Sequence, residues 1–143
     1  MTGRLTVRPD FGVSPLTLIF TLVMAAGAAS AQDVQRGAEA FQTHCATCHG
    51  TAADGTGTMA IVMTVPPADL TQLSTNNAGE FPLAGVVRRI DGTYEVLSHG
   101  GPMPLWGMIL DGPSAVIVDV DGTEVIAPEI IVDVAAWLRT VQQ

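Results

Sequence analysis

Apolar residues recur at helical spacing in three stretches of the chain. The first stretch follows Asp33, a residue type that often caps helix N-termini, and it places Val34, Ala38, Phe41 and Cys45 at positions i, i+4, i+7 and i+11. These positions share one face of a helix. The pattern therefore predicts a helix that begins after Asp33 and presents Cys45 at its carboxyl end.

Two more helices are predicted further along. One covers residues 80–90, with Pro82 near its start and Asp91-Gly92 as its stop signal. The last helix begins at Pro128, because proline suits the first turn, and Glu129 there favours the helix dipole. The apolar face of the first of these contains Leu83, Val86, Val87 and Ile90, and that of the last contains Ile130, Val134, Trp137, Leu138 and Val141.

Residues 115–127 follow a different pattern. Valine and isoleucine dominate on both sides of Asp121-Gly122, a dipeptide typical of a type I′ turn, so this stretch predicts a β-hairpin. The expected fold class is mainly all-α, with about three to four helices and this hairpin inserted before the C-terminal helix. The function of the inserted hairpin, residues 115–127, is not readable from the sequence.

The amino terminus resembles a secretory signal peptide. Arg4 and Arg8 form a positive region, an apolar run follows from residue 16 to residue 26, and Ala29-Ser30-Ala31 supplies small residues for cleavage. The alternative is an uncleaved membrane anchor, but the strongly apolar part is short for a span of about 20 residues. We expect residues 1–31 to be removed and residues 32–143 to form one domain.

Cleavage changes the charge of the chain. The mature part has four arginines, no lysine and thirteen acidic residues, a net charge of −9. This charge argues against nucleic acid and anionic membranes as partners. We expect redox protein partners with a basic docking face, although the charge could also serve solubility alone.

Residues 45–49 read Cys-Ala-Thr-Cys-His, the pattern that attaches haem c. Thiols at i and i+3 lie on one side of a helical turn, where each can bond one vinyl group of a porphyrin. The histidine that follows is then held under the iron as its proximal ligand. The motif predicts one covalent haem on Cys45 and Cys48 with His49 on the iron, and such attachment occurs on the periplasmic side of the inner membrane.

Two other kinds of site share the spacing of these cysteines. Zinc is disfavoured because the chain has only two cysteines and His99 lies far from the other histidines. Thioredoxin-like chemistry is disfavoured because no βαβ pattern surrounds the motif.

With these residues in place, residues 33–143 resemble the class I c-type cytochromes, small mono-haem electron carriers. In that family the first and last helices cross at a glycine and an aromatic residue, and an aromatic residue of the last helix packs there. Gly37, Phe41 and Trp137 match these positions.

The resemblance also implies a methionine as the second axial ligand, in a loop shortly before the last helix. Met103 lies in such a loop between two prolines and after two glycines, so we expect it to bind the iron. The alternatives are Met59, Met63, Met108, His44 and His99, with Met108 the closest methionine and His99 a possible replacement ligand. His44 is expected at the surface.

One further role follows from the resemblance. A backbone carbonyl in residues 65–71 should accept a hydrogen bond from the proximal histidine, and Pro66 is the candidate. The charge pattern adds candidates for the haem propionates. Arg88 and Arg89 are half of the mature cations, and they either neutralise a propionate or form a solvated helix face, while Trp106 with its indole N–H is the other candidate.

Three classes of function fit a single haem. The expected one is a periplasmic one-electron carrier with His/Met ligation, either diffusing freely or held as the haem subunit of a dehydrogenase or oxidase complex. A haem peroxidase needs an open distal site with acid–base groups, and a gas-binding sensor needs five-coordinate iron and an output module. The expected axial ligands favour the carrier, which is not itself an enzyme.

Overall fold

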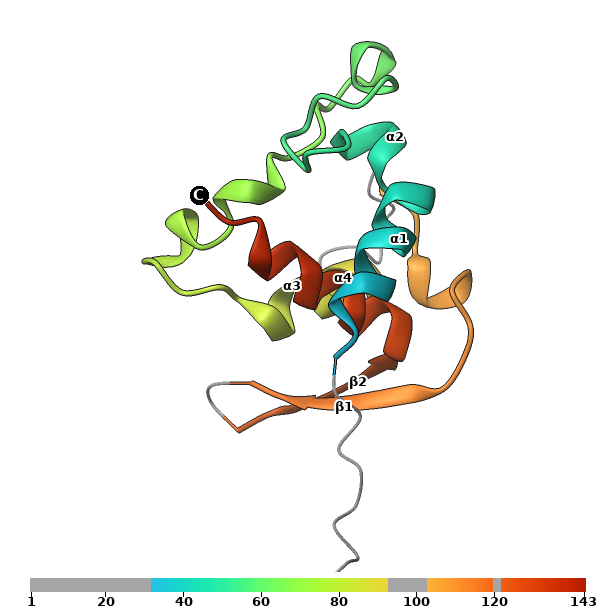
Figure 1. The fold of residues 1–143 in the computed structure, drawn as a ribbon, viewed down its shortest axis with the longest axis vertical. Helices are drawn as coiled ribbons and strands as arrows, with labels where there is room; N and C mark the ends of the chain where they lie inside the picture. The colour runs from blue at the N-terminus through green and yellow to red at the C-terminus, as the bar shows by residue number, and fades with distance from the viewer. Residues whose placement is uncertain (1–31, 93–102, 120–121) are drawn as a thin grey trace, which may run out of the picture.

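The computed structural model describes residues 32–92, 103–119 and 122–143. Four α-helices lie in these ranges: α1 (Val34–His44), α2 (Ala46–His49), α3 (Leu83–Asp91) and α4 (Glu129–Thr140). One two-stranded antiparallel sheet pairs β1 (Ser114–Val118) with β2 (Glu124–Pro128). Short 3-10 helices fill the connections at Ala60–Val62, Leu70–Gln72, Thr75–Asn77 and Trp106–Met108. The mainly helical fold class is confirmed (Figure 1), whereas the predicted signal peptide lies outside the described residues.

The first helix forms where the sequence predicts it. The Asp33 side chain accepts a hydrogen bond from the Arg36 amide at 2.9 Å, which satisfies one of the free donors at the helix start. At the other end the chain passes through Cys45 directly into α2. The first cysteine therefore stands at the junction between α1 and α2.

The helices α1 and α4 cross in direct contact (Figure 1). A Cβ added to Gly37 would lie 2.0 Å from the carbonyl oxygen of Asp133, so only glycine lets the two backbones approach this closely. One turn further on, the rings of Phe41 and Trp137 pack with their centroids 4.5 Å apart. The crossing expected from the family resemblance is confirmed.

A buried carboxylate holds the start of α1 against α4. Asp133 is 2% exposed and accepts hydrogen bonds from the Asp33 amide and from the Arg36 side chain, which also pairs with Glu129 at 3.4 Å. The raised pKa of Arg36 has the Asp133 hydrogen bond as its main cause. Because a buried charge needs such partners, this contact fixes the register of the two helices.

The buried face of α4 is wider than predicted. The predicted stripe packs on the core, with Val134 and Leu138 buried and the other three residues partly buried, but Ile131, which was not predicted, is completely buried. The reason is that α4 packs against α1 on one side and against α3 and the hairpin on others. Nearly every position from 131 to 138 is therefore inside the protein.

The second predicted helix begins later than expected. α3 starts at Leu83, with Pro82 as its N-cap, and Glu80 lies outside the helix. Its end is as predicted, because Gly92 caps it in the left-handed region with φ 95°. The predicted apolar face is confirmed at Val86, Val87 and Ile90, which are buried.

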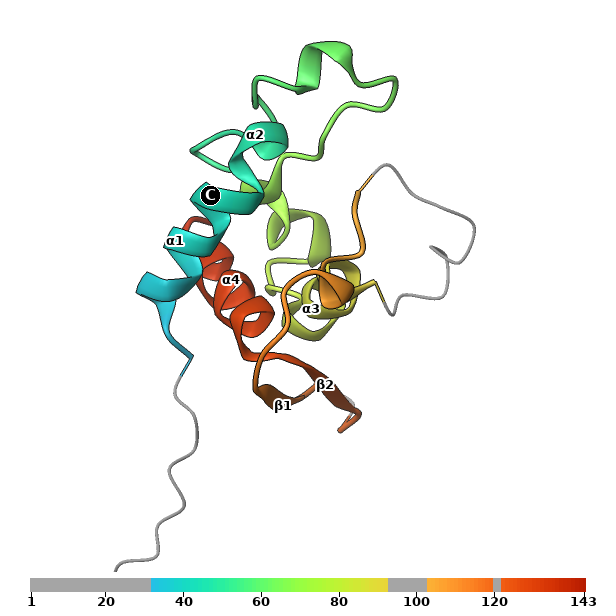
Figure 2. The same cartoon turned by 90° about the vertical axis from the view of Figure 1, so that its right-hand side faces the viewer.

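The predicted hairpin is confirmed. Ile117 pairs with Val125, and both point inward onto the core, while their neighbours Val116 and Ile126 pair on the outer face. Figure 2 shows the hairpin below α3 and α4, at one end of the molecule. The hairpin packs against α3 and α4, and its inward side chains complete the core.

The turn of this hairpin lies partly outside the described residues, because Asp121 is not described. Gly122 has φ 85°, and the Asp119 amide donates to the Thr123 carbonyl at 2.8 Å. None of the helices within the described ranges has the length and apolar character of a membrane-spanning segment.

Candidate functional site

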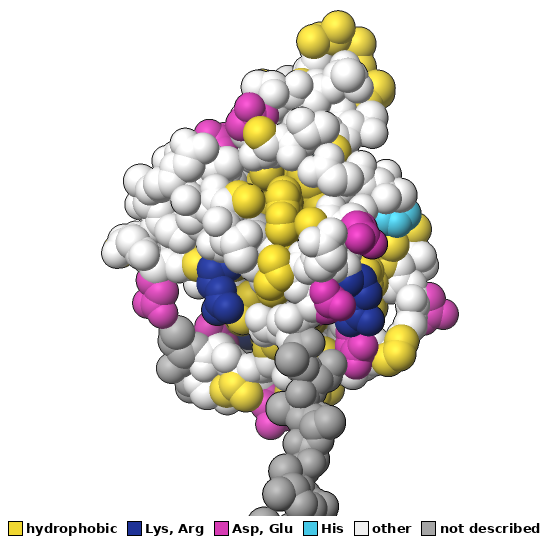
Figure 3. Space-filling model, in the orientation of Figure 1, with side chains coloured by type: hydrophobic (Ala, Val, Ile, Leu, Met, Phe, Trp, Pro, Cys, Tyr) yellow, Lys and Arg dark blue, Asp and Glu magenta, His cyan; other side chains and the backbone are white. Residues whose placement is uncertain are grey.

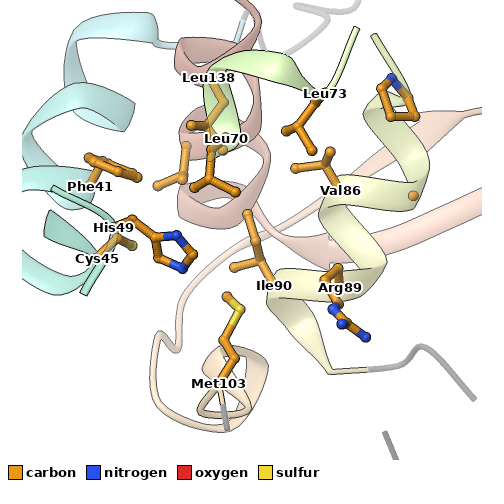
Figure 4. Close-up of a pocket in the computed structure, with 13 residues that line it drawn as sticks. Phe41, Cys45, His49, Leu70, Leu73, Val86, Arg89, Ile90, Met103 and Leu138 are labelled. Atoms are coloured by element: carbon orange, nitrogen blue, oxygen red, sulfur yellow. The ribbon is translucent and has the colours of Figure 1, made fainter. Parts of the chain in front are cut away.

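A cavity of about 390 Å³ lies between α1, α3, α4 and the loop that carries Met103 (Figure 4). Its walls are almost entirely apolar, and the exceptions are the thiol of Cys45, the ring of His49 and the guanidinium of Arg89. The lining residues are Phe41, Cys45, His49, Leu70, Leu73, Pro82, Gly85, Val86, Arg89, Ile90, Met103, Val134 and Leu138. Such a cavity suits a large, flat and mostly apolar ligand.

Both motif cysteines are free and partly buried. Cys45 borders the cavity, while Cys48 lies one turn along on α2. Burial, together with the nearby Cys48, raises the pKa of the Cys45 thiol to about 11. A thioredoxin-like site needs a thiol with a lowered pKa, so this alternative does not fit the site.

The ring of His49 is oriented by a backbone carbonyl. Nδ1 of His49 lies 3.1 Å from the carbonyl oxygen of Ala68. Because a carbonyl can only accept, Nδ1 carries the hydrogen, and Nε2 keeps a free lone pair that can bind a metal. The predicted segment is right, but the predicted residue, Pro66, is wrong.

The fold around Ala68 explains this correction. The Leu70 amide donates to the Ala53 carbonyl at 2.8 Å, and the Asp69 side chain caps the 3-10 helix that follows. The Pro67 carbonyl oxygen instead packs against Gly55, where an added Cβ would lie 2.8 Å away. These contacts set the backbone so that the next carbonyl, that of Ala68, faces the histidine.

Two glycines that the sequence reading did not single out support the motif. The Gly55 amide donates to the His49 carbonyl at 2.8 Å, and the Gly57 amide donates to the Cys48 carbonyl at 3.2 Å. A Cβ on Gly57 would lie 2.4 Å from that carbonyl oxygen. The sequence Asp54-Gly-Thr-Gly just after the motif could have predicted this tight turn, in which the chain folds back against α2.

Met103 reaches into the cavity from the loop that precedes the 3-10 helix at Trp106–Met108. Figure 4 shows its side chain extending from its loop toward the ring of His49. The loop is fixed at the end of α3, since a Cβ on Gly107 would lie 2.1 Å from the Asp91 carboxylate and Leu105 packs against Gly92. The structure therefore brings Cys45, His49 and Met103 together at one cavity.

The alternative ligands lie elsewhere. Met59, Met63 and Met108 do not line the cavity, and Met108 is 83% exposed. His44 is exposed, as predicted, and its ring contacts Trp106 with centroids 5.6 Å apart. His99 lies outside the described residues.

The three residues considered for the propionates also separate. Arg89 borders the cavity, whereas Arg88 pairs with Asp119 of the hairpin at 3.4 Å. Trp106 packs against His44 and does not line the cavity. Arg89 is the residue of the three whose position suits a propionate at the cavity edge.

These residues fit a haem. One thiol stands at the junction of α1 and α2 and the other lies on α2. An oriented imidazole and a thioether face one apolar cavity, and a guanidinium lies at its edge. Among the described residues, no cluster of three or more His, Cys, Asp or Glu side chains could hold a metal ion on its own. The donors present are thus those that a porphyrin-bound iron accepts.

The comparisons with known proteins agree with this site. The family model described as Cytochrome c matches residues 34–142. No curated protein and no solved structure matches the chain. The chain belongs to the cytochrome c family, and its cofactor is covalently bound haem c with its iron.

Proposed function

We propose that this haem-c protein is a periplasmic one-electron carrier whose iron has His49 and Met103 as axial ligands. In this proposal Cys45 and Cys48 form the two thioether bonds to the haem. The observation that supports it most is the placement of His49 and Met103 on one apolar cavity, with Met103 extending toward the histidine ring.

Each residue has a defined task in this proposal. The haem supplies a redox centre that holds or releases one electron. His49 is kept in one orientation and one tautomer by the Ala68 carbonyl, which strengthens it as a ligand. The thioether of Met103 favours the ferrous state and raises the potential.

The apolar walls contribute as well. Phe41, Val86, Ile90 and Leu138 line the cavity and are buried, so they exclude water from the redox centre. Close packing also keeps the ligands in the same places in both oxidation states. Small rearrangement between the two states favours fast electron transfer.

The enzyme and sensor alternatives fit the cavity less well. A peroxidase needs acid–base groups on an open distal side, but the Met103 side chain extends into the cavity toward the ring of His49, where it would occupy the distal position. Among the described residues, the charged group at the cavity is Arg89, at its edge. A sensor that binds gases would require Met103 to give up the axial position on the iron that this proposal assigns to it.

The compartment and the partner belong to the same proposal. The segment 1–31 has the features of a signal peptide, and attachment of haem to the motif takes place in the periplasm. After cleavage the carrier has a net charge of −9, so its redox partner presents a basic docking face to it. It acts either as a diffusing carrier or as the haem subunit of a dehydrogenase or oxidase.

A redox titration of the purified holoprotein tests the proposal. The absorbance change should follow a reversible one-electron Nernst curve, and the protein should not consume hydrogen peroxide catalytically. Catalytic turnover of peroxide, or reduction without reversible oxidation, would contradict the carrier role.

A further inference from the structure

We propose that an apolar tip beside the haem motif docks into an apolar groove on the redox partner, a protein with basic residues around that groove. The apolar tip consists of Met59, Ile61, Val62 and Val65. This inference rests on the proposed carrier function, because it names the surface through which the carrier meets its partner.

The sequence around the apolar tip is unusual for this chain. No charged residue occurs between Asp54 and Asp69, although the chain is strongly acidic. Large apolar residues replace the missing charges in the middle of the segment. The result is an uncharged segment with an exposed acidic residue at each end, Asp54 and Asp69.

These side chains are exposed rather than buried. Ile61 is 89% exposed and Val62 is 67% exposed, and Met59 and Val65 are exposed beside them. None of the four belongs to the core or packs against it. The segment around Ala60–Val62 forms the top of the molecule in Figure 1, and Figure 3 shows hydrophobic side chains gathered there. Exposed apolar patches commonly mark interaction sites.

The apolar tip is attached firmly to the haem motif. The Met59 amide donates to the Thr47 carbonyl at 2.9 Å, and Gly57 packs against Cys48. Within the tip, the Val62 amide donates to the Met59 carbonyl at 3.1 Å and closes the 3-10 helix. A partner that binds the tip is therefore held beside Cys48, where a haem thioether is proposed.

The charge of the molecule selects the kind of occupant. Anionic membranes repel residues 32–143, whose net charge is −9, and two copies of this part repel each other. A protein groove with basic residues around it matches both the apolar tip and the exposed carboxylates of Asp54 and Asp69 at the two ends of its segment. Because a stable interface buries about 800 Å² per partner, the tip acts as the anchor of a larger contact.

Photo-crosslinking identifies the occupant. A photoreactive amino acid replaces Ile61 in the full chain, expressed in the cells that naturally make it, and the matched control carries it at Val116 on the outer face of the hairpin. Val116 is 57% exposed and lies at the other end of the molecule (Figure 2). We expect position 61, and not position 116, to form an adduct with a redox protein that contains haem, flavin or copper.

Kinetics with that purified protein complete the test. In the variant Ile61→Ser/Val62→Ser, the half-saturating concentration for electron transfer should rise about tenfold at an unchanged limiting rate. The control Val116→Ser/Ile126→Ser, with Ile126 64% exposed, should behave as wild type. The proposal is overturned if position 61 forms adducts only with a second copy of the chain, only with lipid or with nothing. It is also overturned if the two double variants transfer electrons with equal kinetics.

These outcomes are separate from those of the proposed function. The one-electron titration of both variants depends on the haem cavity and not on the apolar tip. If the titration fails, the carrier role is wrong. If the titration succeeds but crosslinking and kinetics fail, only the docking surface is wrong.

Discussion

At the scale of single residues, Met103 is expected to set the potential of the haem. Met103→Ala should abolish the weak near-infrared sulfur-to-iron charge-transfer band of the ferric protein and lower its potential, because the soft ligand that favours ferrous iron is lost. Absorption spectra and redox titration of the variant measure both effects.

The control for this prediction is Met108→Ala. Met108 is 83% exposed and does not line the cavity, so its removal should leave the band and the potential unchanged. If Met108→Ala removes the band while Met103→Ala keeps it, the ligand assignment in this loop is wrong.

Gly37 is expected to be essential for stability. In Gly37→Ala the new Cβ would lie 2.0 Å from the Asp133 carbonyl oxygen, so α1 and α4 must separate. Overpacking of this kind costs about 1–3 kcal/mol, more than the ~1 kcal/mol that alanine gains in helix propensity. Because the clash is with backbone atoms, the cost should lie at the upper end of this range, so we expect a net loss of about 2 kcal/mol in guanidinium unfolding of the ferric holoprotein.

Gln35→Ala, on the exposed side of the same helix, serves as the control. Surface changes of this kind usually stay within about 0.5 kcal/mol. Equal stabilities of Gly37→Ala and wild type would show that the helix crossing tolerates a methyl group.

Single residues also show where sequence reasoning stops. Gly37, Phe41 and Trp137 were predictable, because a glycine inside a helix needs a reason and the family supplies one. The carbonyl that orients His49 belongs to Ala68 and not to Pro66. That choice depends on contacts of residues 53, 55 and 70, which are tertiary and leave no local pattern.

At the scale of elements, the contact between His44 and Trp106 links the end of α1 to the methionine loop. In His44→Ala this ring contact is lost, and a comparable aromatic pair is worth about 0.5–1.5 kcal/mol. The loop should then open more often, so cyanide should replace Met103 on the ferric iron roughly two- to tenfold faster. Stopped-flow absorbance measures this rate.

Thr43→Ala is the neighbouring control, because Thr43 is exposed and its hydroxyl donates to the Glu39 carbonyl within α1. Its cyanide rate should match wild type. A His44→Ala rate equal to that of the control would mean that the ring contact does not restrain the loop.

The elements differ in how far the sequence determines them. α1 and the end of α3 were predictable because local caps, Asp33 and Gly92, define them. The buried face of α4 was not, because contacts with α1, α3 and the hairpin surround that helix. Periodicity identifies one apolar face, but it does not show how many neighbours will cover the others.

At the scale of the whole molecule, the acidic charge should guide the approach to the partner. Electron transfer with the native partner should slow as salt rises, because ions screen charges beyond a Debye length of about 8 Å at physiological ionic strength. Stopped-flow rates across an ionic-strength series test this. If the rate does not change with salt, the acidic charge has no role in partner recognition and serves solubility instead.

The most direct test of the account is whether carbon monoxide binds to the ferrous holoprotein. If His49 and Met103 fill both axial positions, the absorption spectrum of the reduced protein should stay the same under carbon monoxide at neutral pH. The Met103→Ala variant should bind the gas readily, because one position is then open. A wild-type spectrum that shifts at once on exposure to carbon monoxide would contradict the six-coordinate electron carrier described above.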